Sequence, residues 1–142
     1  METRPTLLLM KGLPFSGKTE YAKKWCDEAS DRVRVSWTEL LRVLAPRATK
    51  DRRALAFEGA IHLMSEAMKR GMSVVLDEEN LNSVEWGIFV TFAARYHAHV
   101  EWHTMPVDVE ESKRRNALHG SPVRDLDIER KAADYAAFLK QK

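Results

Sequence analysis

The sequence has few of the features that mark secreted or membrane proteins. It contains a single cysteine, Cys26, so no disulfide can form within the chain. No apolar run approaches the ~20 residues that a helix needs to cross a bilayer. The apolar stretch Leu7–Met10 is also too short for a secretory signal. We therefore expect a cytoplasmic protein that makes no contact with a membrane.

Charge of one sign is not in large excess either. The chain has 23 lysines and arginines against 21 aspartates and glutamates, which gives a formal net charge of +2. Nucleic-acid-binding domains usually carry a strong basic excess on one face, so this balance does not identify one by itself. Of the 142 residues, 44% are hydrophobic and 31% are charged, as in ordinary globular proteins. This length suits one domain, which we expect to span residues 1–142.

Short apolar runs alternate with segments of helical periodicity along the chain. The expected strands are continuous apolar or alternating runs, at residues 6–10, 32–36, 73–77 and 98–105. The alternation of charge with valine in 32–36 favours a strand near one edge of the sheet. The expected helices have apolar residues three and four apart, at about 19–29, 36–46, 52–68, 84–96, 108–118 and 125–140. This alternation predicts an α/β fold of three layers, in which a parallel sheet of about four strands has helices on both faces.

The loop Gly12–Thr19 carries the most specific motif in the sequence. It reads Gly-Leu-Pro-Phe-Ser-Gly-Lys-Thr and fits the P-loop pattern G-x-x-x-x-G-K-[ST] completely. It also lies between an expected strand and an expected helix, as that motif requires. Glycines at both ends let consecutive backbone N–H groups converge on phosphate oxygens at the positive end of the helix. We therefore expect this loop to bind the triphosphate of a purine nucleotide, namely ATP with Mg²⁺.

Several residues have expected roles in this nucleotide site. The ammonium of Lys18 should lie against the β- and γ-phosphates, and the hydroxyl of Thr19 should ligate Mg²⁺. Asp77 ends a strand expected beside the loop and should hold Mg²⁺ through water. The alternative for Asp77 is a structural role as a cap of the turn that follows. The expected nucleotide-binding residues of the loop are Gly12, Pro14, Ser16, Gly17, Lys18 and Thr19.

The role of Glu39 is open from the residue pattern. Ser36-x-x-Glu39 has the form of a capping box that opens a helix. Glu39 also follows the second expected strand, at the mouth of the same cleft, where a general base would act. Glu39 and Asp77 are therefore the two candidates for the catalytic base. Trp37, beside Glu39, either packs in the core or stacks on a base of the acceptor.

Basic residues late in the chain suggest a lid over about residues 113–124. Lys113-Arg114-Arg115 stands late in one expected helix, and Arg124 follows a Gly-Ser-Pro turn. Arg115 and Arg124 would close over the nucleotide and neutralise charge on the transferring phosphoryl group. The alternative is that these cations simply favour helix C-termini and solvent.

These motifs together resemble the P-loop kinase domains of the phage-type polynucleotide 5′-kinase family. They are also similar to zeta-toxin-like kinases and to phage kinases that phosphorylate a hydroxymethylated pyrimidine in DNA. The resemblance rests on Leu7–Thr19 with Pro14, on the turn at residues 77–82, and on residues 113–116 with Gly120, and it covers nearly the whole chain. It implies a P-loop kinase fold and ATP-dependent phosphorylation of an alcohol group, with a catalytic acid after the second strand and lid arginines near the end.

Two positions depart from the pattern of that family. Its general-base aspartate aligns with Thr38, and Glu39 follows one residue later. Its lid arginine aligns with His119, which leaves Arg115 as the matching upstream arginine and Arg124 as a substitute. The first departure bears on the assignment of Glu39 as the base, and the second bears on the acceptor. The candidate acceptor-binding residues are Trp37, Thr38, Arg42, Asn80 and Asn82.

The leading hypothesis is a kinase that transfers the γ-phosphoryl group of ATP to a hydroxyl of a nucleic acid. The accepting hydroxyl would be the 5′-hydroxyl of DNA or RNA, or that of a hydroxymethylated base in DNA, and DNA is the preferred acceptor. Basic residues between positions 32 and 53 would contact the phosphates of the nucleic acid. One alternative is a kinase for a nucleotide or another small molecule, which would need a closed pocket. Another is a non-catalytic ATP-binding switch or degenerate kinase, which the two departures motivate.

Overall fold

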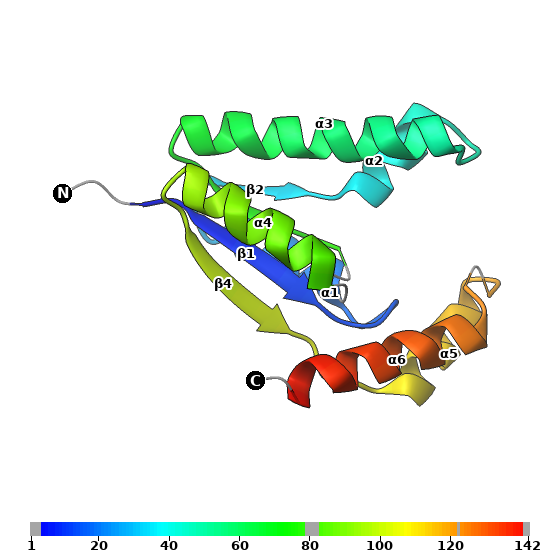
Figure 1. The fold of residues 1–142 in the computed structure, drawn as a ribbon. Coiled ribbons are helices and arrows are strands. Elements are labelled where there is room, and N and C mark those ends of the chain that lie inside the picture. The colour runs from blue at the N-terminus through cyan, green and yellow to red at the C-terminus, as the bar shows by residue number, and fades with distance from the viewer. Residues whose placement is uncertain (1–3, 79–82, 122, 141–142) are drawn as a thin grey trace.

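The computed structural model describes residues 4–78, 83–121 and 123–140 (Figure 1). Its strands are β1 (Thr6–Lys11), β2 (Arg32–Val35), β3 (Ser73–Leu76) and β4 (His99–Thr104). Its helices are α1 (Lys18–Asp27), α2 (Trp37–Leu44), α3 (Lys50–Lys69), α4 (Ser83–Arg95), α5 (Val109–Leu118) and α6 (Asp125–Lys140). Every expected element is present within these ranges, and the boundaries differ from the expected ones by at most a few residues.

The four strands form one parallel sheet in the order β2-β3-β1-β4. Leu9 of β1 pairs with Leu76 of β3, and Leu76 pairs in turn with Val35 of β2. Strand β2 lies at an edge, as its alternating charges predicted. Because parallel strands end at the same edge, this register places the loop after β1 beside the residues that follow β3 and β2.

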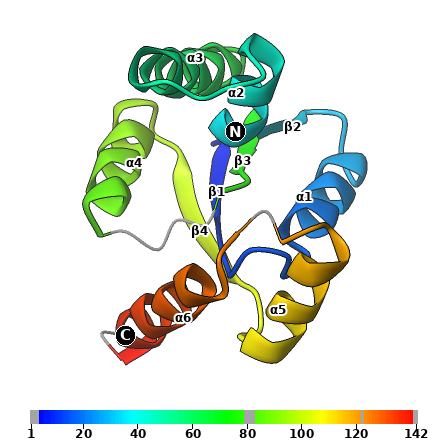
Figure 2. The ribbon, with the colours of Figure 1, turned by 90° about the vertical axis from the view of Figure 1, so that its right-hand side faces the viewer.

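Helices cover both faces of the sheet (Figure 2). Helix α1 lies on one face, while α4 lies on the opposite face and α3 runs beside it over the β2–β3 end. Helices α5 and α6 pack against each other beyond the carboxyl end of β4. The α/β fold with three layers, predicted from the alternation of elements, is therefore confirmed.

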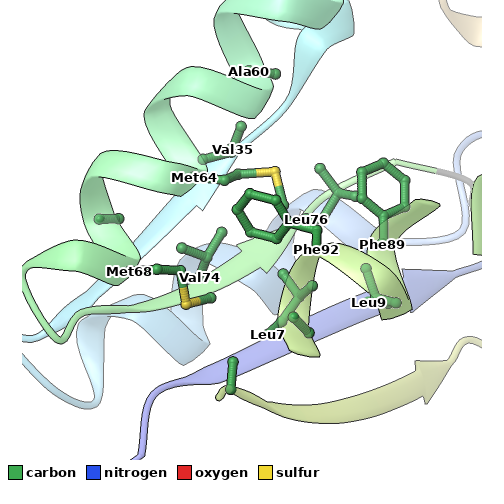
Figure 3. Close-up of a cluster of buried hydrophobic side chains, with 13 residues drawn as sticks. Leu7, Leu9, Val35, Ala60, Met64, Met68, Val74, Leu76, Phe89 and Phe92 are labelled. Atoms are coloured by element: carbon green, nitrogen blue, oxygen red, sulfur yellow. The ribbon is translucent and has the colours of Figure 1, made fainter. Parts of the chain in front are cut away.

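The core is divided by the sheet because successive side chains of a strand point to opposite faces. Leu7, Leu9, Val74 and Leu76 pack toward α3 and α4, where they meet residues such as Phe89 (Figure 3). Residues one position along pack on the other side: Leu8, Met10 and Val75 cluster with Ala22 of α1. Most of these side chains are fully buried, and each large one contributes about 1.5–3 kcal/mol of transfer free energy.

Helix α2 begins as its sequence signature predicts. Ser36 is the N-cap, with an extended backbone, and its hydroxyl accepts a hydrogen bond from the amide of Glu39 at 3.2 Å. This bond satisfies one of the unpaired N–H groups in the first turn. The cap also fixes where the side chains of the first turn of α2 stand relative to the end of β3. Within the described residues, no helix has the length and apolar content to cross a membrane.

Candidate active site

The phosphate loop links β1 to α1 through backbone conformations that most residues avoid. Gly17, the N-cap of α1, has a φ of 92°, and Phe15 has a φ of 60°. A Cβ on Gly12 would lie 2.6 Å from Ser16 Oγ and 3.0 Å from Met105 Cβ. Side chains are therefore excluded at Gly12 by space and disfavoured at Gly17 by backbone conformation. The loop forms a backbone cradle at the start of the helix.

The donors around this cradle suit a polyanion. The hydroxyl of Ser16 is buried, and within the described residues it has no hydrogen-bond partner. Gly17 makes no side-chain cap of α1, and the N–H groups in the first turn of a helix are donors that suit phosphate oxygens. The ammonium of Lys18 donates to the carbonyls of Leu13 at 2.8 Å and of Gly12 at 3.3 Å, which holds its positive charge against the loop. The geometry fits the triphosphate expected from the motif.

A chain of four side chains connects this loop to α2. Thr19 Oγ1 donates to Asp77 Oδ2 at 2.8 Å. Arg34 lies 2.7 Å from the same oxygen and forms two further bonds of 2.7 Å with the carboxylate of Glu39. The Asp77 side chain is 3% exposed and that of Glu39 is 46% exposed. Hydrogen bonding to Arg34 lowers the pKa of Glu39, and the bonds to Glu39 and Asp77 raise the pKa of Arg34.

The hydroxyl of Thr19 and the carboxylate of Asp77 fit a magnesium site. Both offer hard oxygen ligands, and they lie within hydrogen-bond distance of each other at the mouth of the loop. Mg²⁺ commonly binds through one or two protein ligands together with phosphates and waters. In the described part of the chain, no three His, Cys, Asp or Glu side chains gather into a metal cage. The site therefore suits a metal that arrives with a nucleotide.

Glu78 is a second acid at the end of β3 that the sequence did not single out. Its Oε1 accepts from the amide of Thr38 at 2.8 Å and from the hydroxyl of Ser36 at 3.2 Å. Its Oε2 accepts from the hydroxyl of Thr38 at 2.9 Å. Burial raises the pKa of this carboxyl, although the bonds from Thr38 and Ser36 oppose that effect. Its position next to Asp77 was the available sequence signal, but it did not reveal the contact with α2.

Arg115 is the lid cation that reaches the phosphate loop. It donates to the carbonyl of Phe15 at 2.9 Å and also pairs with Glu111 at 2.8 Å. The ring of His119 stacks on that of Phe15, with centroids 5.1 Å apart. His119 thus also lies beside the loop, at the position where the resembling family has an arginine. Hydrogen bonds from Arg114 and Arg115 lower the pKa of Glu111 to about 2.

The other basic residues of the expected lid pair with acids of α5 and α6. Lys113 contacts Glu129 at 2.6 Å. Arg124, which is 74% exposed, pairs with Asp127 at 3.0 Å in the first turn of α6. The structure therefore brings Arg115 to the nucleotide site and leaves Arg124 in an ion pair at the surface.

A cavity of about 470 Å³ opens between α2 and α3, beside two of the residues expected to bind an acceptor. Trp37, Thr38 and Arg53 line it together with Phe57. Trp37 stacks on Phe89, with centroids 5.9 Å apart, and meets Phe57 edge to face. It therefore packs in the core and borders the cavity at the same time.

The remaining acceptor-side candidates are less informative. Arg42 is exposed on α2. Asn80 and Asn82 lie outside the described residues. Of the expected acceptor-side residues, the structure thus brings Trp37 and Thr38 together at one cavity.

Comparison with known proteins places this geometry in a family. A model of the AAA domain family matches residues 7–137, which is most of the chain. The chain belongs to the AAA domain family. No curated protein matches this AAA domain significantly in sequence.

Solved structures resemble this AAA domain much more closely in fold than in sequence. A chain of the Pnkp1/Rnl/Hen1 RNA repair complex has a TM-score of 0.87 and 17% identity, and the match covers 100% of this chain and 47% of that one. The APS kinase CysC of Mycobacterium tuberculosis, in complex with AMPPNP and APS, has a TM-score of 0.62 and 16% identity, with coverage of 82% and 72%. The Deinococcus radiodurans tunicamycin resistance protein has a TM-score of 0.64 and 14% identity, with coverage of 92% and 80%. These likenesses show a shared fold.

Proposed function

We propose that this AAA domain is an ATP-dependent kinase that transfers a phosphoryl group to a hydroxyl of a nucleic acid. The observation that supports it best is that two consecutive residues after β3 bond to both regions: Asp77 bonds to Thr19 at the phosphate loop, and Glu78 bonds to Thr38, which lines the cavity. The phosphate loop with Lys18 and the Thr19–Asp77 pair lies on the α1 side. The cavity bordered by Thr38 lies on the side of α2 and α3. Donor and acceptor would meet between them.

On the donor side, backbone amides at the start of α1 and the ammonium of Lys18 would bind the triphosphate. Thr19 and Asp77 would hold Mg²⁺, which supplies charge neutralisation on the β- and γ-phosphates when it is bound. Arg115, already in contact with the loop at Phe15, would neutralise charge that develops during transfer. We assign it to a lid over about residues 113–124. Because these groups are fixed before the reaction, catalysis would come mainly from positioning and electrostatics.

A nucleic-acid acceptor is supported by the basic surface around the cavity. Arg53 lines the cavity, and Arg42, Arg47, Lys50 and Arg52 are exposed on α2, on α3 or between them. Such a cluster suits phosphates that follow the acceptor nucleotide. The likeness to a chain of an RNA repair complex agrees with this assignment. DNA remains the preferred acceptor, through a 5′-hydroxyl or a hydroxymethylated base.

A small-molecule acceptor is the second candidate, and the cavity itself favours it. A volume of about 470 Å³ lies in the range of pockets that enclose a single small ligand. The fold likeness to the APS kinase also agrees with this alternative. Salt distinguishes the two, because binding of a polyanion weakens steeply as salt concentration rises, whereas binding of a small neutral acceptor does not.

The direct test is transfer of label from [γ-³²P]ATP to a panel of acceptors. The panel holds DNA and RNA with 5′-hydroxyl ends, hydroxymethylated DNA, nucleosides and small alcohols. We expect labelled nucleic acid with wild-type protein, loss of label with Lys18→Ala, and no loss with Lys24→Ala, which changes an exposed lysine of the same helix. Label on small acceptors alone would replace the proposal with the second candidate. Tight ATP binding without transfer to any acceptor would indicate a degenerate kinase.

A further inference from the structure

Three carboxylates lie where the acceptor hydroxyl would approach the phosphate loop. They belong to Asp77, Glu78 and Glu39, and each is tied to a different set of groups. A hydroxyl that attacks phosphorus must give up its proton, so a side chain that can accept this proton has to lie beside it. The contacts of the three acids decide which of them is placed for that task.

Asp77 and Glu39 are both occupied by the same guanidinium. Arg34 bonds to the buried Asp77 and forms a bidentate ion pair with Glu39. Asp77 in addition accepts from Thr19, on the nucleotide side of the sheet. A carboxylate that is held by a guanidinium is a weak proton acceptor, because the cation stabilises its charged form. These contacts suit Asp77 for the donor side and Glu39 for a structural pair.

Glu78 also lies at the carboxyl end of the strands, but its carboxylate bonds to α2. Val75 packs with Ala22 of α1, and Leu76 packs on the opposite face. Of the two acids that follow β3, Asp77 bonds to Thr19 of α1 and Glu78 bonds to Thr38 of α2. The hydroxyl and amide of Thr38 both donate to its carboxylate. Thr38 in turn lines the acceptor cavity. The carboxylate of Glu78 is therefore hydrogen-bonded to a residue that lines the cavity, so a substrate hydroxyl bound beside Thr38 would lie next to it.

We propose that Glu78, held by Thr38, is the carboxylate that binds the acceptor hydroxyl and receives its proton. This inference rests on the proposed kinase function and adds a residue to it. In the step, the hydroxyl oxygen forms a bond to the γ-phosphorus of ATP while the bond from that phosphorus to the β,γ-bridging oxygen breaks. The proton passes from the hydroxyl to Glu78, and the bonding electrons leave with ADP. Thr38 acts as a positioning residue that fixes the carboxylate.

The structural alternative is that Glu78 only caps the first turn of α2. A glutamine would largely serve that purpose, because its amide oxygen still accepts from the Thr38 amide. It would not take up a proton. The Glu78→Gln variant therefore separates the two roles, and a second variant guards against misfolding. Thr38→Asp combined with Glu78→Thr exchanges the acid and the hydroxyl across the same hydrogen bond.

The experiment measures kcat, the KM for ATP and thermal stability with the best acceptor of the panel. We expect Glu78→Gln and Glu78→Thr each to lower kcat by about 10²- to 10⁴-fold, with the KM for ATP changed less than about threefold. The exchange variant should recover at least about tenfold over Glu78→Thr, because the carboxylate returns to the same gap. Glu101→Gln, on an exposed position of β4, is the matched control and should keep wild-type kcat.

Each other outcome has a defined meaning. Retention of wild-type kcat by Glu78→Gln would refute the proposal. Parallel loss of stability, ATP affinity and kcat, with no recovery in the exchange variant, would assign Glu78 to capping alone and refute it as well. If the wild-type protein labels no acceptor, the proposed kinase function itself is refuted. The acceptor panel is therefore tested with the wild-type protein before the Glu78 variants are made.

Discussion

Arg34 is the side chain whose removal should reveal how the site is held together. Replacing it with methionine keeps most of the aliphatic stem but removes the guanidinium that pairs with Asp77 and Glu39. The Asp77 side chain is 3% exposed, so its charge would stay buried beside Thr19 without the guanidinium that now pairs with it. Breaking a buried pair in this way costs about 3–5 kcal/mol. The Glu39 side chain is 46% exposed, and its pair contributes at most about 1 kcal/mol.

Because Arg34 itself is 16% exposed and water can approach it, we expect Arg34→Met to lower the free energy of unfolding by about 2–4 kcal/mol. Urea denaturation at neutral pH, followed by circular dichroism, measures this loss. Glu39→Gln should cost less than about 1 kcal/mol in the same assay. Asp77→Asn in the Arg34→Met background should restore at least about 1 kcal/mol, since it removes the uncompensated charge.

The double substitution is the decisive part of this cycle. If Arg34→Met costs less than about 1 kcal/mol, Asp77 is not a buried charge that depends on Arg34. If Asp77→Asn deepens the loss in that background, the cost of Arg34→Met does not come from an uncompensated charge on Asp77. Either result would refute the reasoning on which the donor-side geometry depends.

Three further predictions follow from other contacts. Gly12→Ala should abolish nucleotide binding measured by calorimetry, because its Cβ would lie 2.6 Å from Ser16 Oγ, whereas Gly59→Ala, with open space around it, should bind normally. Phe89→Ala should lower the free energy of unfolding, measured in urea, by about 3–5 kcal/mol because Phe89 is fully buried. Val90→Ala should lower it by less than about 1 kcal/mol because Val90 is exposed. Burial raises the pKa of Glu78 in the folded state, so the protonated carboxyl favours folding. In urea titrations, the free energy of unfolding of wild type relative to Glu78→Gln should be highest below a pH of about 4.3. It should fall as pH rises through the pKa that Glu78 has in the folded state.

The fold could be predicted from the sequence because its signals are local. Continuous apolar runs marked β1 and β3, and apolar residues three and four apart marked α3. The loop Gly12–Thr19 fixed the junction between β1 and α1, since its pattern requires a strand before it and a helix after it. The placement of Asp77 beside that loop then followed from the parallel order of the strands.

The acceptor side could not be predicted in the same way because its contacts are distant in sequence. Arg34 lies 43 residues from Asp77, and Thr38 lies 40 residues from Glu78. Alternating charge and valine around Arg34 indicated a strand at an edge, which says nothing about the partner of the guanidinium. The capping box drew attention to Glu39, and the structure confirms the bond between its amide and Ser36. Its carboxylate, however, turns to Arg34 and not to the cavity.

In the proposed kinase, the two consecutive acids that follow β3 would let one short segment act on both substrates. Asp77 bonds to Thr19 on the side of α1, while Glu78 bonds to Thr38 on the side of α2. The sheet therefore separates the carboxylate suited to a metal from the carboxylate suited to a hydroxyl, although one peptide bond joins them. Hydrogen bonds to Thr19 and Thr38 hold the two carboxylates in place, and phosphoryl transfer depends on such positioning.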